Sequence, residues 1–147
     1  PWVDADAELE RRAGKTIKQI FVEQGESAFR NLESSVVADV AASDSQIVAL
    51  GGGAVLRDEN RKALAGRGKF VWLKAPPEVL WARMMADETT AARRPNLTRD
   101  GGLAEIRTLL AERSPIYAAC ANITIDADDR PPAEIARQII TELKLQG

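Results

Sequence analysis

Residues 46–53 read Gln-Ile-Val-Ala-Leu-Gly-Gly-Gly. A short apolar run that stops at glycines is typical of a buried β-strand. Three consecutive glycines allow backbone N–H groups to approach a bound oxygen without obstruction from side chains, and they equally suit a tight turn between a strand and a helix. The stretch therefore predicts a buried strand, and it leaves open whether the glycines bind a ligand or only turn the chain.

Strand-like and helix-like segments alternate on both sides of this stretch. We expect further strands at 1–3, 69–74 and 122–125, and helices over 6–12, 26–40, 58–66, 78–85, 103–121 and 132–145. Thr16 to Gln19 fits a capping box that opens a short helix ending at Gly25. Strands separated by helices imply an α/β fold in three layers, with a parallel sheet covered on both faces.

The composition excludes several classes of function. The chain has 147 residues, which fits one domain, and its formal net charge of −2 argues against binding to nucleic acid or a membrane surface. It has no histidine and one cysteine, Cys120, which excludes a zinc site of Cys and His, a Ser-His-Asp triad and an internal disulfide. We therefore expect one cytoplasmic domain over 1–147 whose chemistry rests on carboxylates, Arg, Lys or backbone amides.

Two acidic residues follow the first expected strand. In a parallel sheet, ligands lie beyond the carboxyl ends of the strands, and Val3-Asp4-Ala5-Asp6 places two carboxylates there. Such a pair suits a divalent cation together with a hydroxyl that loses its proton. The simpler interpretation is that Asp6 only caps the following helix.

Several arginines have equally open interpretations. Arg30 and Glu33 lie one turn apart on the expected helix, so that Arg30 either binds a carboxylate bidentately while Glu33 orients it, or forms a solvated ion pair. Arg113 has the same two interpretations. Residues 87–102 are polar, contain Arg93-Arg94-Pro95 and lack periodicity, so we expect a mobile loop that could close over a transferring phosphate.

Gly14-Lys15-Thr16 looks like the end of a phosphate-binding loop of the form G-x-x-x-x-G-K-[ST]. The first glycine of that motif would fall at position 9, which is Leu9, and the preceding segment has the pattern of a helix rather than a strand. We therefore expect no phosphate loop at this position.

Five stretches, taken in order, resemble shikimate kinase. They are Val3-Asp4-Ala5-Asp6, GKTIKQIFVEQGESAFRNLE (Gly14 to Glu33), ALGGGAVL (Ala49 to Leu56), RRPNLT (Arg93 to Thr98) and ERSPIYAACA (Glu112 to Ala121). The resemblance covers essentially the whole chain. It implies a P-loop fold of the nucleoside-monophosphate-kinase type and transfer of the γ-phosphate of ATP to the 3-hydroxyl of shikimate, a step of aromatic amino-acid biosynthesis, with ATP and Mg²⁺ as cofactors.

The resemblance also implies roles for individual residues. Asp6 would bind the acceptor hydroxyl and could act as the base, while Asp4 would help to hold Mg²⁺ through water. Arg30 and Arg113 would clamp the shikimate carboxylate. The full set of implied substrate-binding residues is Asp6, Phe29, Arg30, Glu33, Gly52, Gly53 and Arg113. The implied nucleotide-binding residues are Arg83, Arg94, Arg130 and Pro132, with Arg94 as a lid arginine that stabilises charge on the transferred phosphoryl group.

The family's first strand, phosphate loop and first helix have no counterpart in these residues, so we expect the 147-residue chain to be inactive by itself. Two alternatives stay open. One is a related kinase of a sugar acid such as gluconate, and the other is a non-catalytic binding module derived from a kinase. In each case we expect a monomer that binds a small molecule and neither nucleic acid nor a membrane.

Overall fold

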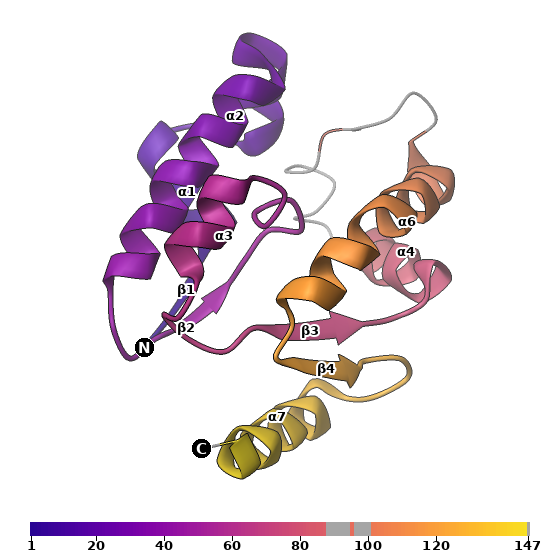
Figure 1. Ribbon diagram of the computed structural model, residues 1–147. Helices are drawn as coiled ribbons and strands as arrows, with labels where there is room; N and C mark the ends of the chain where they lie inside the picture. Colours follow the sequence, from indigo (N-terminus) through magenta and orange to yellow (C-terminus); the bar gives the residue numbers. More distant parts are fainter. Residues whose placement is uncertain (88–94, 96–100, 147) are drawn as a thin grey trace. The chain divides into compact units, whose positions relative to one another are not determined.

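The computed structural model describes residues 1–87, Pro95 and residues 101–146, with the side chain of residue 146 left out. They fall into two compact units (Figure 1). The first unit is built on Pro1–Gly68, and the second on Lys69–Ala86 together with the chain after Thr98. The single domain expected over 1–147 stays a prediction, and most of the expected lid segment, 87–102, lies outside the described residues.

The first unit consists of two parallel strands and three helices. Its elements are β1 (Trp2–Asp4), α1 (Ala5–Ala13), α2 (Ile17–Ala42), β2 (Ile47–Ala49) and α3 (Asp58–Leu64). β1 pairs with β2 in parallel, with Trp2 opposite Ile47 and Asp4 opposite Ala49. The carboxyl ends of both strands therefore meet at one edge, where the chain continues into α1 and into the triglycine segment.

The ends of α1 and α2 follow the signals in the sequence. Gly14 adopts a left-handed conformation (φ 68°) at the end of α1, and its N–H donates to Glu10 O at 2.9 Å. Thr16 and Gln19 form both hydrogen bonds of the predicted capping box at the start of α2. Gly14-Lys15-Thr16 thus joins two helices, which confirms that it is no phosphate loop.

Gly25 interrupts α2 at the predicted position. Its backbone angles (φ 86°, ψ 172°) lie outside the helical region, and the helical geometry continues on both sides of it. Only glycine adopts such angles readily, so the residue divides α2 into a short segment and a long one.

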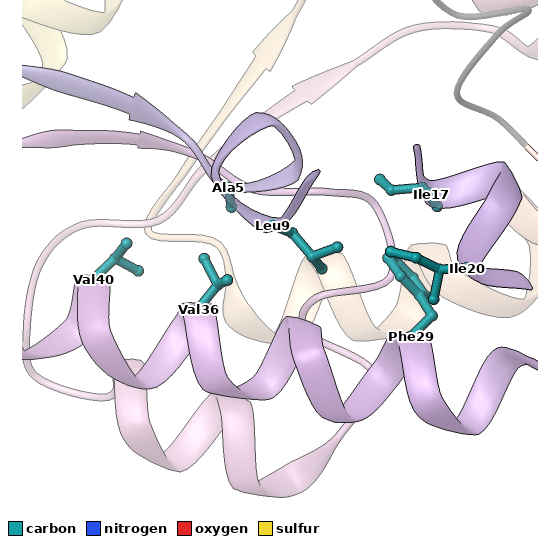
Figure 2. Packing of buried hydrophobic residues seen from close by; sticks show 7 residues of the cluster. All are labelled: Ala5, Leu9, Ile17, Ile20, Phe29, Val36 and Val40. Atoms are coloured by element: carbon teal, nitrogen blue, oxygen red, sulfur yellow. The ribbon is translucent and has the colours of Figure 1, made fainter. Parts of the chain in front are cut away.

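A hydrophobic cluster joins α1 to both segments of α2. Figure 2 shows Leu9 of α1 between residues of α2, with Ile20 beside Phe29 at one end and Val36 and Val40 at the other. Leu9 is 1% exposed and Ile20 is fully buried. Burial of such side chains stabilises the packing by about 1.5–3 kcal/mol each, so the cluster fixes α1, which follows β1 directly, against α2.

The prediction of a buried strand at residues 46–50 is wrong for β2 within the first unit. Ile47 is 74% exposed, as is its partner Trp2 at 75%, whereas Val3 and Val48 pack against the hydrophobic cluster. Side chains alternate between the two faces of a strand, and in this unit the helices cover only one face of the β1–β2 pair.

The second unit also contains one parallel strand pair. Its elements are β3 (Val71–Lys74), α4 (Pro77–Ala86), α6 (Gly102–Cys120), β4 (Ile123–Asp126) and α7 (Pro132–Gln146). β3 pairs with β4, and Ile123, Ile125 and Ile135 form a small core between β4 and α7. The α/β class with parallel strand pairing is confirmed in both units. Among the described residues, no helix has both the length and the apolar character that a membrane span needs.

Candidate functional site

Asp4 ends β1 and caps α1. Its Oδ1 accepts hydrogen bonds from the backbone N–H groups of Asp6 at 2.9 Å and Ala7 at 3.1 Å. The interpretation that Asp6 serves as the cap is therefore wrong. Asp4 has the extended backbone (φ −94°, ψ 115°) of an N-cap residue, whereas Asp6 already lies in the first turn of the helix. Asp6 therefore does not cap α1.

The carboxylate of Asp6 lies against the first glycine of the triglycine segment. A Cβ atom added at Gly51 would lie 2.7 Å from Asp6 Oδ1 and 3.1 Å from Oδ2. Side chains of other residues essentially never come so close to a Cβ, so the absence of a side chain at position 51 makes room for this carboxylate.

The guanidinium of Arg30 lies against the third glycine. A Cβ atom added at Gly53 would lie 2.7 Å from the guanidinium carbon of Arg30. Arg30 is 9% exposed, and its Nη1 donates to Oε1 of Glu33, itself 4% exposed, at 2.9 Å. The interpretation of these two residues as a solvated ion pair is therefore wrong. Arg30 also lies 3.5 Å from the exposed carboxylate of Glu26.

The triglycine segment brings the predicted acidic and basic groups to one place. Asp6 contacts one end of it and Arg30 the other, while Gly52 lies exposed between them. Since consecutive Cα atoms are about 3.8 Å apart, the two end glycines are at most about 7.6 Å apart. We call the group of Asp6, Arg30, Glu33 and residues 51–53 the triglycine site.

Phe29 belongs to the hydrophobic cluster beside this site. It is 6% exposed, its ring centroid lies 4.9 Å from that of Phe21, and the guanidinium carbon of Arg30 lies 5.1 Å from its own centroid. The ring thus supports Arg30 through a cation–π contact. The contact of Phe29 with the substrate that the resemblance implies stays a prediction.

An ion network fixes the helix that carries Asp6. Glu8 accepts hydrogen bonds from Arg11 at 2.8 Å and from Arg12 at 2.7 Å, and Arg12 also binds Asp39 of α2 at 2.5 Å. The two guanidinium groups lower the pKa of the Glu8 carboxyl from 4.5 to about 2. The network links α1 to the far segment of α2 from the solvent side.

Comparison with known proteins identifies the family. The family model described as shikimate kinase matches residues 1–144. The chain belongs to the shikimate kinase family. Its fold is accordingly the P-loop, nucleoside-monophosphate-kinase-like α/β fold that the resemblance implied, and the family consists of ATP-dependent small-molecule kinases.

Individual relatives agree with this identification. A shikimate kinase of Symbiobacterium thermophilum is 43% identical over 147 residues, covering all of this chain and 83% of the relative, and one of Thermobifida fusca is 44% identical over 145 residues, covering 99% and 81%. The solved shikimate kinase of Acinetobacter baumannii, in complex with shikimate, superposes with a TM-score of 0.86 at 34% identity, over 99% of this chain and 78% of that one.

Three of the four implied nucleotide-binding residues, Arg83, Arg130 and Pro132, lie in the second unit. Arg83 of α4 donates to Ala127 O at 2.5 Å, and Arg130 donates to Asp126 O at 3.0 Å. Both arginines therefore hold the loop after β4, and Pro132 is the first residue of α7, which follows that loop. The structure brings the three together around one loop, while their contact with a nucleotide stays a prediction.

The predicted roles of Arg113 and Arg94 are not tested by the described residues. Arg113 is half-buried on α6 of the second unit, and no hydrogen bond or ion pair holds it within the described ranges 1–87 and 101–146. Its place beside Arg30 stays a prediction. Arg94 lies outside the described residues.

Gly51 is a site residue that the sequence analysis missed. The family resemblance implies substrate binding for only the second and third glycines of the segment, Gly52 and Gly53. The signal that a carboxylate would contact Gly51 was not local, because Asp6 lies 45 positions earlier in the chain. It required the register in which Asp4 pairs with Ala49.

Proposed function

We propose that this chain supplies the shikimate-binding part of a shikimate kinase that transfers the γ-phosphate of ATP to the 3-hydroxyl of shikimate. The observation that carries the proposal is the triglycine site, in which a carboxylate and a buried guanidinium contact opposite ends of one glycine segment whose middle residue, Gly52, is exposed. Shikimate carries a carboxylate at one end and hydroxyls at the other, so the site matches it in charge.

Arg30 would bind the shikimate carboxylate. A guanidinium has five N–H donors. Glu33 accepts from Nη1 and Glu26 lies 3.5 Å from Nη2, so further N–H donors remain for the shikimate carboxylate. Hydrogen bonds to charged groups are worth about 1.5–3 kcal/mol, so loss of Arg30 would weaken shikimate binding by roughly 10- to 150-fold. Glu33 would hold the guanidinium in place, and Arg113 would provide the second clamp.

Asp6 would orient the attacking hydroxyl and accept its proton. Phosphoryl transfer depends on positioning and on neutralisation of charge more than on covalent help from the protein. A carboxylate within hydrogen-bond reach of the 3-hydroxyl meets the positional need. The backbone amides of Gly52, which is exposed, and of Gly53 would donate to substrate oxygens, and Arg94 would neutralise charge on the transferred group.

Asp4 fits a secondary role toward Mg²⁺. Its Oδ1 is used by the helix cap, and the described residues contain no cluster of three or more acidic, Cys or His side chains that could hold a metal. Mg²⁺ usually binds through one or two carboxylates together with water and nucleotide phosphates, which suits a single contact through water from Asp4. Bound with ATP, Mg²⁺ supplies charge neutralisation at the phosphates, and Arg83, Arg130 and Pro132 would contact the adenine.

We further propose that the 147-residue chain is one cytoplasmic, monomeric kinase domain. By itself it would not catalyse the reaction of ATP with shikimate. The described residues offer no phosphate-binding loop, because Gly14-Lys15-Thr16 joins two helices. Formation of ADP from ATP and shikimate by these 147 residues alone would refute this part. Light scattering after size-exclusion chromatography tests the monomer.

A ligand comparison tests the proposed reaction in the full-length protein. We expect ATP-dependent turnover with shikimate and little or none with gluconate, and a thermal shift with shikimate alone. Turnover of gluconate without turnover of shikimate would instead support a sugar-acid kinase. Absence of any turnover, with shikimate binding retained, would support a non-catalytic binding module.

The variant Arg30→Ala tests the assignment of the clamp. It should raise KM for shikimate by roughly 10- to 150-fold and leave KM for ATP within about twofold, since a charge-assisted contact to only one substrate is lost. Equal damage to the use of both substrates would argue against a carboxylate clamp.

A further inference from the structure

The segment after the triglycine, Ala54–Leu56, is tied to α3 through three consecutive carbonyls. Asn60 Nδ2 donates to Ala54 O at 2.9 Å. Arg61 Nη1 donates to Val55 O at 2.6 Å and to Leu56 O at 2.8 Å. Both donors come from the first two turns of α3, so this helix holds the segment by side chains rather than by a strand ladder.

Asn60 is the buried member of this pair. Asn60 is 2% exposed, and Ala54, whose carbonyl it binds, is 0% exposed. A buried amide costs free energy unless it is hydrogen-bonded, and a carbonyl in the same place cannot turn to water instead. Loss of the bond from Asn60 would therefore leave the Ala54 carbonyl buried without a partner, whereas the contacts of Arg61 are only part-buried.

Backbone hydrogen bonds connect this segment to the glycines. Ala54 N donates to Gly51 O at 3.0 Å, and Leu56 N donates to Gly53 O at 3.1 Å. A displacement of Ala54 would therefore move Gly51, whose Cα faces Asp6, and would alter the close approach of Gly53 to Arg30.

We infer that Asn60 is a positioning residue for the substrate: by fixing Ala54, it holds the glycine segment that separates Asp6 from Arg30. It touches neither group directly and acts through the backbone of residues 51–54. The inference rests on the proposed function for its kinetic consequence, and on the hydrogen bonds alone for its structural one.

The isosteric variant Asn60→Asp, made in the full-length protein, tests the inference. It removes the donor and places a carboxylate oxygen against Ala54 O while keeping the size of the side chain. We expect KM for shikimate to rise by about 5- to 150-fold with KM for ATP within about twofold, because an unsatisfied buried carbonyl costs about 1–3 kcal/mol. Asn60→Ala removes the same donor without introducing a charge. It should likewise raise KM for shikimate and leave KM for ATP within about twofold.

Amide hydrogen exchange supplies a readout that does not depend on activity. Peptides that cover residues 51–56 should exchange about 10-fold faster in Asn60→Asp than in the wild type, for the same free-energy reason. The matched control is Val40→Ala, which removes buried methyl groups from the hydrophobic cluster. Val40 is 8% exposed and lies near the C-terminal end of α2. It should lower stability while leaving both KM values and the exchange of residues 51–56 close to those of the wild type.

The outcomes separate the two proposals. Unchanged exchange at residues 51–56 in both Asn60 variants would overturn the anchoring role. Faster exchange with a KM for shikimate equal to that of Val40→Ala would overturn the positioning role. A wild type that neither binds nor uses shikimate would overturn the proposed function, and the exchange comparison would still decide the anchoring.

Discussion

Gly51→Ala perturbs the contact between the triglycine segment and Asp6, the proposed base. The structure gives the displacement that this variant requires. The new Cβ would lie 2.7 Å from Asp6 Oδ1, and an ordinary contact begins at 3.4 Å, so the carboxylate or the loop must move by about 0.7 Å. Backbone strain contributes nothing, because Gly51 is not among the residues with positive φ.

Gly51→Ala should change both the kinetics and the stability of the protein. Misplacement of a reacting group by about 1 Å can cost about 100-fold in rate, so we expect kcat/KM to fall by roughly 10- to 100-fold. Overpacking destabilises the protein by about 1–3 kcal/mol. The change from Gly to Ala stabilises it by about 0.4–1 kcal/mol, because it reduces the conformational entropy of the unfolded chain. The net destabilisation should therefore be about 0–2.5 kcal/mol, or a few degrees in Tm.

Steady-state kinetics of the full-length protein, with a urea titration beside them, measure both effects. Gly68→Ala is the matched control, because no heavy atom lies within 4 Å of its Cβ position and its φ is not positive. It should leave kcat/KM within about twofold and raise stability by about 0.4–1 kcal/mol. If Gly51→Ala also kept kcat/KM within twofold, the placement of Asp6 against Gly51 would have no part in the reaction.

Three further predictions concern the parts that support the site. Arg30→Met should cost about 3–5 kcal/mol, because it leaves the buried carboxylate of Glu33 unpaired. Glu33→Leu should cost less, because Arg30 keeps its contact with the exposed carboxylate of Glu26. The double variant should be nearly neutral in a urea titration yet fail to bind shikimate by calorimetry, and shikimate binding by it would contradict the clamp. Thr16→Ala should lower the free energy of unfolding by about 1 kcal/mol through loss of the capping box with Gln19, and a loss below roughly 0.3 kcal/mol would contradict that role. The Glu8 pKa is lowered to about 2 in the folded state, so its contribution to stability is present above about pH 4.5 and is lost as the pH falls toward 2. The Tm difference between wild type and Glu8→Gln should therefore shrink over that range, and a difference independent of pH would argue against the ion network.

Local signals in the sequence predicted the helix boundaries well. The capping box at Thr16, the left-handed Gly14 and the break at Gly25 each depend on a few neighbouring residues and on backbone angles that glycine allows. The same local information could not decide whether Asp4 or Asp6 caps α1. Both are good capping residues, and the choice depends on where β1 ends, which its pairing with β2 determines.

Contacts between distant segments were not predictable in the same way. The burial of Arg30 and the fit of Asp6 against Gly51 depend on how α1, α2 and the triglycine segment pack together. The exposure of Ile47 has the same origin, since an apolar side chain in a strand is buried only where another element covers its face. Family resemblance supplied the grouping of Asp6 with Arg30 that spacing alone left open.

The most direct test of the account is a crystal structure of the full-length protein with shikimate. We predict the shikimate carboxylate within about 3 Å of the Arg30 guanidinium, with Arg113 on its other side, and a ring hydroxyl at the same distance from Asp6. Shikimate bound elsewhere, or bound here with no contact to Arg30 and Asp6, would contradict the central claim that the triglycine site binds the substrate.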